Sequence, residues 1–526
     1  MKVLISDSLS EEGLKILNEV EDLQIDAYDK VAPEKLKEII GGYDALIVRS
    51  GTKVTRDIIE CGKKLRVIGR AGVGLDNVDA EAASEHGIIV MNTPEGNTIA
   101  TAEHTMSLLL AMARNIPRAN ESLRQGKWER KNLTGVELYG KILGIVGLGR
   151  VGSEVAKRCR SFGMRILAFD PFLLAERASK LEVELVPLED LLRQSDFITV
   201  HTPLTKETKY LIGAKELDMM KKGVRVVNCA RGGIVEEKAL LAAIQSGKVA
   251  GAAIDVFEEE PPKELSLVTA DGVVATPHLG ASTNEAQINV AIDIAKQVVD
   301  ALLDRGIRNA VNYPSVDGEV IKVIRPYLKL AENIGALQSQ LVDGRITNVK
   351  VRYSGEPATY DTTPITVALV KGLLTPVLGE TVNYVNAQML AKNRGITVTE
   401  SKTTESEEFT NLIATEVKTD KLRSIIDGAL FSKDNPRIVK IDEFYVDAVP
   451  HGHMIITFNK DVPGIIGAIG TILGRNNINI AGMTFGRRKQ GGRAITVLNV
   501  DSPISEAVLK EISSADNIYD VRQIVL

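Results

Sequence analysis

Residues 141–162 read KILGIVGLGRVGSEVAKRCRSF, and this stretch decides the fold. The apolar run ILGIV is followed by Gly147, Gly149 and Gly152, and then by a segment with helical spacing. Between a buried strand and a helix, such glycines let a pyrophosphate approach the backbone at the positive N-terminus of the helix. Taken alone, the motif fits an ordinary glycine-rich turn about equally well.

The next apolar run, RILAFD, adds an acid in the expected place, because it ends in Asp170, 18 residues after Gly152. A carboxylate there can hold both ribose hydroxyls and repels a 2′-phosphate, so NAD is favoured over NADP. Asp170 could instead be a surface acid at a strand end. Strand, glycines, helix and acid together predict a dinucleotide site.

Outward from this motif, short Val- and Ile-rich runs alternate with helical segments, which is typical of parallel sheets covered by helices. Six such runs after residue 140 predict a doubly wound sheet. Residues 1–97 predict a second, flavodoxin-like parallel sheet. The helix expected at 98–114 would bridge the two lobes, and the one at 283–306 would return to the first lobe, which NAVNYPSV (309–316) could close.

The regular alternation of short apolar strands and helices ends at about residue 315. Helices (323–341 and 383–395) mix with strands (347–356, 396–403 and 437–446), and residues 450–526 follow the order β-α-β-β-α-β of a ferredoxin-like fold. We therefore predict an α/β protein with a doubly wound domain inserted into the first domain, then an α+β intervening domain and a ferredoxin-like domain. The predicted domains are 1–97 with 287–315, 98–286, 316–449 and 450–526.

Composition excludes several classes of protein. Lys+Arg 64 against Asp+Glu 69 leaves a net charge of −5 without a basic stripe, which argues against nucleic acid as a partner. Three scattered cysteines form no CxxC pair, so neither a disulfide framework nor a metal site is expected. The N-terminus resembles no signal peptide and no apolar run could cross a bilayer. We expect a soluble cytoplasmic protein.

If the dinucleotide accepts a hydride from a hydroxy acid, the protein must supply a base and a cation for the carboxylate. Of six histidines, His201 and His278 follow strands of the doubly wound sheet, and His278 stands in the loop-like sequence TPHLG. The acidic run 258–260 offers a partner carboxylate, although such a run is usually just solvated. Arg231, after another strand, could grip a carboxylate or form a surface ion pair.

Four segments together resemble the D-isomer-specific 2-hydroxyacid dehydrogenases over roughly residues 1–313: GKILGIVGLGRVG, VNCARGGIVEEKAL, GAAIDVFEEEP and ATPHLGAST. The resemblance implies that the first lobe binds substrate and the inserted domain binds NAD. It also implies that Arg231 binds the carboxylate, Glu260 partners the histidine and His278 is the acid/base. The residues implied to bind NAD are Gly147, Gly149, Arg150, Val151, Gly152, Asp170, Thr202, Cys229, Ala230, Asp255, Gly280 and Ala281.

Within that family, GRAGVGLDNVD and NTPEGNTIATAEH resemble the members that oxidise 3-phospho-D-glycerate. Gly72, Val73 and Gly74 would then offer backbone N–H groups to the carboxylate. Arg49 and Arg70 would meet the phosphate, although each could equally be a surface or domain-packing arginine. Trp128, the single tryptophan, is read as a packing or dimer contact.

The segment FNKDVPGIIGAIGTILGRNNINIAGM resembles an ACT domain, a module that often pairs and binds amino acids. Asp461 and Asn479 match the positions implied to hold L-serine as an effector; helix capping and turn formation are the alternative. A homo-oligomer, either a dimer or a tetramer, is implied. Residues 316–449 resemble the anion-binding regulatory domain of the family members that oxidise 3-phospho-D-glycerate.

Two other functions stay open at this point. The substrate could be another 2-hydroxy acid, with D-lactate oxidation or glyoxylate reduction as examples, although control by an amino acid fits a serine pathway better. A dinucleotide-sensing corepressor could also keep this fold, but it would not need both Glu260 and His278.

Overall fold

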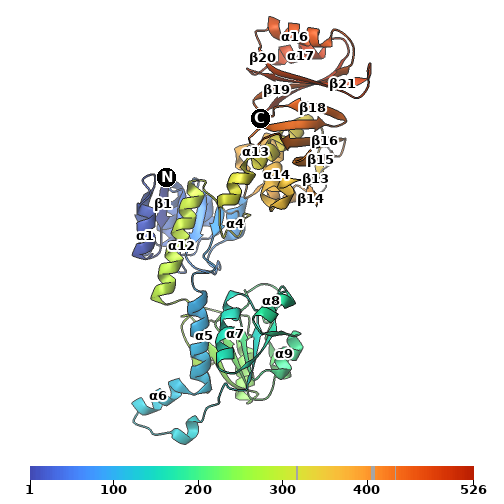
Figure 1. Ribbon diagram of the computed structural model, residues 1–526. Coiled ribbons are helices and arrows are strands. Elements are labelled where there is room, and N and C mark those ends of the chain that lie inside the picture. The colour runs from blue at the N-terminus through green and yellow to red at the C-terminus, as the bar shows by residue number, and fades with distance from the viewer. Residues whose placement is uncertain (315–317, 404–408, 433) are drawn as a thin grey trace.

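The structure is a computed structural model that describes residues 1–314, 318–403, 409–432 and 434–526. Four β-sheets follow one another along the chain, and each sheet with its helices is called a unit below. Figure 1 shows an elongated molecule. Two long helices connect the first and second units, and the third and fourth units extend from the other side of the first.

The first sheet is fully parallel, with the strand order β2-β1-β3-β4-β5, which is the flavodoxin-like order that was predicted. Its strands are β1 (Lys2–Ile5), β2 (Gln24–Ala27), β3 (Ala45–Val48), β4 (Val67–Arg70) and β5 (Ile89–Met91). Its helices are α1 (Glu11–Asn18), α2 (Pro33–Ile39), α3 (Arg56–Cys61) and α4 (Ala80–Glu85). The prediction did not name β2, an edge strand whose side chains are only half-buried and therefore not a continuous apolar run.

The second sheet is also fully parallel, in the order β12-β11-β10-β9-β6-β7-β8, so the predicted doubly wound sheet is confirmed. The six predicted strands are β6 (Ile142–Val146), β7 (Arg165–Phe169), β9 (Phe197–Val200), β10 (Val224–Asn228), β11 (Val249–Ile254) and β12 (Val273–Ala275). The count of six was wrong, because β8 (Glu184–Leu185) adds a seventh strand too short to form an apolar run. Helices α7 (Arg150–Ser161), α8 (Ala175–Lys180), α9 (Leu188–Gln194), α10 (Ala214–Met219) and α11 (Glu237–Gln245) connect the strands.

Two helices join these units. Helix α5 (Thr98–Ala113) leads into the second unit and packs on α7, and α12 (Asn284–Leu302) returns to the first unit, where it packs on α1 and β4. A Cβ on Gly69 of β4 would come within 2.9 Å of the Ile294 side chain on α12, so this glycine allows close packing. Val311 then donates to the Val90 carbonyl at 2.9 Å, which closes the first sheet as predicted; Ser315 and Val316 lie outside the described residues.

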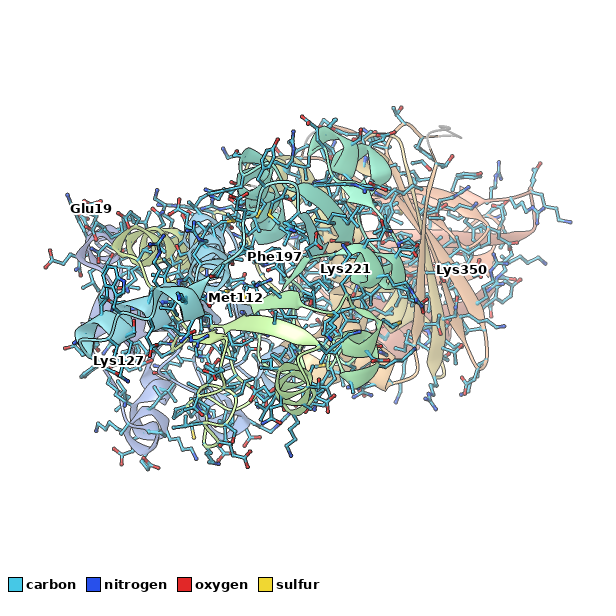
Figure 2. All side chains as sticks on the ribbon, turned by 90° about the horizontal axis from the view of Figure 1, so that it is seen from below. Glu19, Met112, Lys127, Phe197, Lys221 and Lys350 are labelled. Carbon is cyan, nitrogen blue, oxygen red and sulfur yellow. The ribbon has the colours of Figure 1, made fainter. Side chains whose placement is uncertain are left out.

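Helix α6 (Ile116–Arg124) projects from the second unit (Figure 1). Lys127, just after this helix, lies toward the edge of the view in Figure 2, whereas Met112 and Phe197 lie near its centre. Met112 and Phe197 are both buried in the core of the second unit. The α6 segment is therefore an arm outside that core.

The third sheet has the order β14-β13-β15-β16-β17-β18 and is antiparallel except where β13 meets β14. Its strands are β13 (Ile346–Ser354), β14 (Thr397–Thr403), β15 (Leu412–Thr419), β16 (Arg423–Leu430), β17 (Pro436–Ile441) and β18 (Phe444–Ala448), with helices α13 (Gly318–Leu341), α14 (Thr363–Leu378) and α15 (Ala387–Asn393). The predicted strand 437–446 is in fact a hairpin, because Asp442 adopts a left-handed φ of 51° and reverses the chain. Strands β15 and β16 and helix α14 were not predicted.

The fourth sheet has the order β20-β21-β19-β22 and is antiparallel, which confirms the ferredoxin-like prediction. Its elements are β19 (His453–Lys460), α16 (Ile465–Arg475), β20 (Ile480–Arg487), β21 (Arg493–Val500), α17 (Glu506–Ser513) and β22 (Ile518–Val525). One face of this sheet shares a core with the third unit, where the Phe444 and Phe458 rings lie 6.4 Å apart. The last two units are therefore packed as one body.

None of the helices in the described ranges is long and apolar enough to span a bilayer.

Candidate active site

A cleft of about 450 Å³ lies where the carboxyl ends of the strands in the first and second sheets face each other. The first unit contributes the loop that follows β4, including Gly74 and Asp76. The second unit contributes the loops that follow β6, β9, β10 and β12. Loops at the carboxyl ends of parallel strands are where such sheets bind ligands.

The glycine loop between β6 and α7 has the geometry that a dinucleotide site requires. Gly147 has a φ of +93°, and a Cβ there would lie 2.8 Å from the His201 carbonyl oxygen. A Cβ on Gly152 would lie 2.2 Å from the Gly147 carbonyl oxygen, so helix and strand meet only because both residues are glycine. A Cβ on Gly149 would meet no protein atom within 4 Å, which leaves its backbone open to a ligand.

Asp170 lies beside this loop at the end of β7. Its Oδ2 accepts from the Leu148 N–H at 2.9 Å, and its Oδ1 accepts from the Phe172 N–H at 3.0 Å. The carboxylate is thereby fixed next to the phosphate-binding turn. Thr202 lines the cleft with a buried hydroxyl that has no hydrogen-bond partner among the described residues, and a bound ligand could satisfy it.

Other residues predicted to bind the cofactor also line the cleft: Arg150, Val151, Cys229, Ala230, Gly280 and Ala281. Arg150 begins α7 and its Nη2 lies 3.3 Å from Glu95 Oε1. With the glycines and Asp170, these residues fit an extended dinucleotide that lies across the carboxyl edge of the sheet.

The predicted pair of His278 and Glu260 is formed, with Nδ1 of the imidazole 2.7 Å from Oε2 of the carboxylate. The structure also separates the three acids at 258–260: Glu258 accepts from the Tyr210 hydroxyl at 2.8 Å and Glu259 pairs with Lys263. The hydrogen bond to Glu260, opposed by burial, raises the pKa of His278 above its usual value. Burial alone would raise the pKa of Glu260, but the bond to His278 lowers it.

His201, the other candidate base, has a different environment. It is half-buried at the edge of the cleft, its Nε2 lies 3.0 Å from Thr199 Oγ1, and desolvation lowers its pKa to about 4. A histidine that stays neutral and bonded within the sheet is poorly suited to take up a substrate proton. The geometry therefore favours His278.

Asp255 is fully buried behind the His278 loop. Its carboxylate accepts from the Leu279 N–H at 2.7 Å and the Gly280 N–H at 2.9 Å, and it lies 3.0 Å from His104 Nε2. These contacts fix the loop that carries His278; the predicted role of Asp255 in binding NAD stays a prediction. His104 was not among the predicted site residues, because its place on α5 gives no sign of a partner 151 residues away.

Arg231 follows β10 and points toward the first unit. Asn228 supports its turn by donating to the Arg231 carbonyl at 2.9 Å and accepting from the Ala230 N–H at 3.0 Å. Arg231 Nη1 donates to the Ala230 carbonyl at 2.7 Å, and Nε lies 3.2 Å from Asp76 Oδ2 of the first unit.

Arg70 ends β4 and lies over the glycine loop. A Cβ on Gly72, which has a φ of +143°, would lie 1.5 Å from Arg70 Nη1, so no other residue fits at that position without moving the arginine. Arg70 Nε is buried without a partner among the described residues. Burial, reinforced by the nearby positive charge of Arg231, lowers the pKa of Arg70 to about 10. A buried cation short of hydrogen-bond acceptors is a candidate anion ligand.

Arg49 lies close enough to Arg70 for their charges to repel. Its Nη1 donates to the Ser8 carbonyl at 3.2 Å, and its backbone N–H donates to buried Asp7 at 2.6 Å. The first unit therefore brings both predicted phosphate-binding arginines to the same edge of its sheet.

The predicted effector residues lie in the fourth unit and belong to separate hydrogen-bond networks. Asp461 Oδ2 accepts from Arg487 Nη1 at 2.9 Å and from the Gly491 N–H at 3.0 Å. Asn479 donates to Asp501 Oδ2 at 2.7 Å. The structure thus gives each side chain a partner within the chain and shows no contact between the two.

Three family models match the chain. Residues 106–280 match the NAD binding domain of the D-isomer specific 2-hydroxyacid dehydrogenases, residues 323–442 match the D-3-phosphoglycerate dehydrogenase intervening domain, and residues 453–517 match the ACT domain. A glyoxylate reductase from Paecilomyes thermophila (TM-score 0.55, 31% identity) covers 59% of this chain and 98% of its own. A D-lactate dehydrogenase from Aquifex aeolicus, solved with NAD and lactic acid, gives a TM-score of 0.53 at 27% identity, over 60% of this chain and 100% of its own.

Similarity to D-3-phosphoglycerate dehydrogenases extends over the whole chain. The enzyme of Archaeoglobus fulgidus is 47% identical over 100% of both chains. That of Synechocystis is 46% identical over 100% of this chain and 95% of its own, and that of Bacillus subtilis is 44% identical over 100% and 99%. The chain therefore belongs to the D-3-phosphoglycerate dehydrogenases, NAD-dependent oxidoreductases of the D-isomer specific 2-hydroxyacid dehydrogenase family.

Proposed function

We propose that this protein oxidises 3-phospho-D-glycerate to 3-phosphohydroxypyruvate with NAD, the first step of L-serine biosynthesis. One observation carries the proposal: His278, which is paired with Glu260, and Arg231 line the same cleft as Arg150 and Val151 of the dinucleotide loop. A corepressor that only senses a dinucleotide would need no imidazole–carboxylate pair beside that loop.

Three side chains would carry the chemistry. Arg231 binds the substrate carboxylate, and its guanidinium can form two parallel hydrogen bonds to it. His278 takes the hydroxyl proton through Nε2, because Nδ1 is held by Glu260, and Glu260 stabilises the imidazolium that results. NAD supplies the hydride acceptor when bound, and the glycine loop with Asp170 would hold it.

The phosphate would bind to the first unit. Arg70 supports this role most strongly, because its Nε is buried without a hydrogen-bond partner among the described residues, while Nη1 donates to the Ala71 carbonyl at 3.4 Å. Arg49 adds a second positive charge at the same edge, and the backbone of Gly72 to Gly74 offers N–H donors to the carboxylate. A substrate without phosphate would leave the Arg70 charge without an anionic partner.

Regulation and assembly are further parts of the proposal. L-serine would act as an inhibitor at the ACT domain, with Asp461 and Asn479 as its contacts. The chain would form a homo-oligomer, a dimer or a tetramer, through the α6 arm, where Trp128 is 81% exposed and Leu123 is 57% exposed. Large exposed apolar side chains on a projecting segment are typical of protein–protein contacts.

We also propose the domain limits given above, with substrate-binding residues 1–97 and 287–315, NAD-binding residues 98–286, an intervening domain at 316–449 and an ACT domain at 450–526. A cytoplasmic location is supported by Cys61, Cys159 and Cys229, which are all free thiols.

The test is NADH formation by the purified full chain at alkaline pH, which favours oxidation because the reaction releases a proton. 3-Phospho-D-glycerate, D-glycerate and D-lactate are compared, each with and without L-serine. Preference for the phosphorylated substrate, together with inhibition by serine, is the expected result. Preference for D-lactate would support the other dehydrogenase function, and no turnover with any acid would support the corepressor.

A further inference from the structure

Asp76 and Arg231 form an ion pair across the cleft. Asp76 lies in the loop that follows β4 in the first unit, Arg231 follows β10 in the second unit, and Nε to Oδ2 measures 3.2 Å. The Arg231 side chain is 28% exposed and that of Asp76 is 68% exposed, so the acid approaches from the solvent side of the cleft. The catalytic pair and the dinucleotide loop do not require this contact.

The contact engages the side of the arginine that a substrate would need. Nη1 already donates to the Ala230 carbonyl at 2.7 Å, so the Nε–Nη2 edge is the one able to grip a carboxylate through two parallel bonds. Asp76 Oδ2 lies on that edge. Asp76 thus presents to Arg231 a carboxylate, the same chemical group that the substrate would present.

Gly74 permits this arrangement. A Cβ at Gly74 would lie 2.3 Å from Arg231 Nη2 and 2.8 Å from Asp76 Oδ2. The loop therefore has no side chain at the point where the guanidinium and the carboxylate meet, which leaves room for one carboxylate to replace another.

The surrounding charges favour such an exchange. The positive charge of Arg231 disfavours the charged form of Arg70, whereas Asp76 favours it, so Asp76 offsets the repulsion between the two cations. A substrate with a carboxylate and a phosphate brings enough negative charge to neutralise both arginines without Asp76.

We propose that Asp76 is an internal competitor of the substrate carboxylate, holding the Nε edge of Arg231 until substrate replaces it. This inference rests on the proposed role of Arg231. Asp76 thereby sets the substrate affinity of the cleft, because it weakens the binding of every acid whose carboxylate must displace it from Arg231. A residue that merely oriented Arg231 would have the opposite effect on affinity when removed.

The experiment measures binding without turnover. The enzyme is loaded with NADH, which cannot accept a hydride, and 3-phospho-D-glycerate is titrated while NADH fluorescence is recorded. Asp76→Asn is expected to lower the Kd about two- to fivefold, the range for a partly exposed ion pair. Arg231→Gln is expected to raise the Kd, and Asp76→Asn added to Arg231→Gln should give no further gain. Glu81→Gln, which removes an exposed charge from α4 of the same unit, is the matched control and should leave the Kd unchanged.

D-Glycerate separates competition from general charge repulsion. Competition at Arg231 predicts the same relative gain for D-glycerate and 3-phospho-D-glycerate, because both carry the carboxylate. A gain that grows with ligand charge, or that persists in the Arg231→Gln background, would overturn the proposal. Weaker or unchanged binding by Asp76→Asn would also overturn it. If Arg231→Gln binds as tightly as the wild type, the assigned role of Arg231 in the proposed function fails instead.

Discussion

His278 and Glu260 lie 18 residues apart in the chain, yet Nδ1 of the imidazole and Oε2 of the carboxylate are only 2.7 Å apart. Glu260 also accepts from the Phe257 N–H at 3.1 Å, so the carboxylate is held from two directions. The bond leaves Nε2 as the nitrogen that can meet a substrate hydroxyl. It also fixes the direction in which the pH profile responds to mutation.

Glu260→Gln is expected to lower kcat for oxidation about 100-fold and to move the acidic limb of the pH profile to lower pH. Oxidation needs neutral His278, so activity rises as pH passes upward through its pKa. Glu260 holds that pKa above its usual value, and removing the carboxylate must lower it. The check is kcat/KM against pH for both enzymes; a limb that stays in place or moves to higher pH contradicts the assignment.

Arg231→Gln is expected to lower kcat/KM for 3-phospho-D-glycerate about 100-fold, because a charge-assisted bidentate contact is lost. Steady-state kinetics measure the effect. Arg193→Gln, at an exposed position on α9, is the matched control and should retain wild-type values. Equal losses in both variants would point to a folding defect and not to a lost substrate contact.

Arg70→Met is expected to separate stability from binding. In the folded protein, burial lowers the pKa of Arg70 to about 10, so folding disfavours its charged form at every lower pH. Replacing the cation by an apolar chain should raise the free energy of unfolding by about 1–3 kcal/mol. It should also raise KM for 3-phospho-D-glycerate about 10- to 100-fold. Urea unfolding gives the free energy of unfolding, and steady-state kinetics give KM. A variant that is less stable than the wild type contradicts this account of Arg70.

Asp170→Asn is expected to raise KM for NAD about tenfold and to reduce discrimination against NADP, because the negative charge that repels a 2′-phosphate is removed. The Leu148 and Phe172 N–H groups now donate to the Asp170 carboxylate, and the amide oxygen of Asn can still accept from one of them. The fold should therefore survive. The measurement is kcat/KM with each cofactor. An unchanged cofactor ratio would place the discrimination elsewhere.

Much of this site could be predicted from the sequence, since its residues stand directly after apolar strands and parallel strands end at one edge of a sheet. The glycine loop, Asp170, Arg231 and His278 all follow this rule. The run of three acids does not by itself show which residue turns inward; the family resemblance singled out Glu260, and the structure pairs that residue with His278.

Contacts between units could not be predicted in the same way. Asp76 meets Arg231 155 residues away, and this contact depends on how α5 and α12 set the two sheets against each other. Within the second unit, His104 meets Asp255 151 residues away, because α5 packs against β11. Local errors had a local cause. At Asp442 a left-handed residue in the middle of the expected strand 437–446 turns that strand into a hairpin. The local sign is the residue type itself, since Asp tolerates the left-handed region and favours turns.

The central claim, oxidation of 3-phospho-D-glycerate at the His278 cleft, is tested most directly with substrate deuterated at C2. Wild-type enzyme and His278→Gln are incubated with this substrate and NAD, and the reduced cofactor is analysed by mass spectrometry. The account predicts deuterated NADH and 3-phosphohydroxypyruvate in equal amounts from the wild type, and at least 100-fold slower formation by His278→Gln. Reduced cofactor without deuterium, or an undiminished rate in the variant, would contradict it.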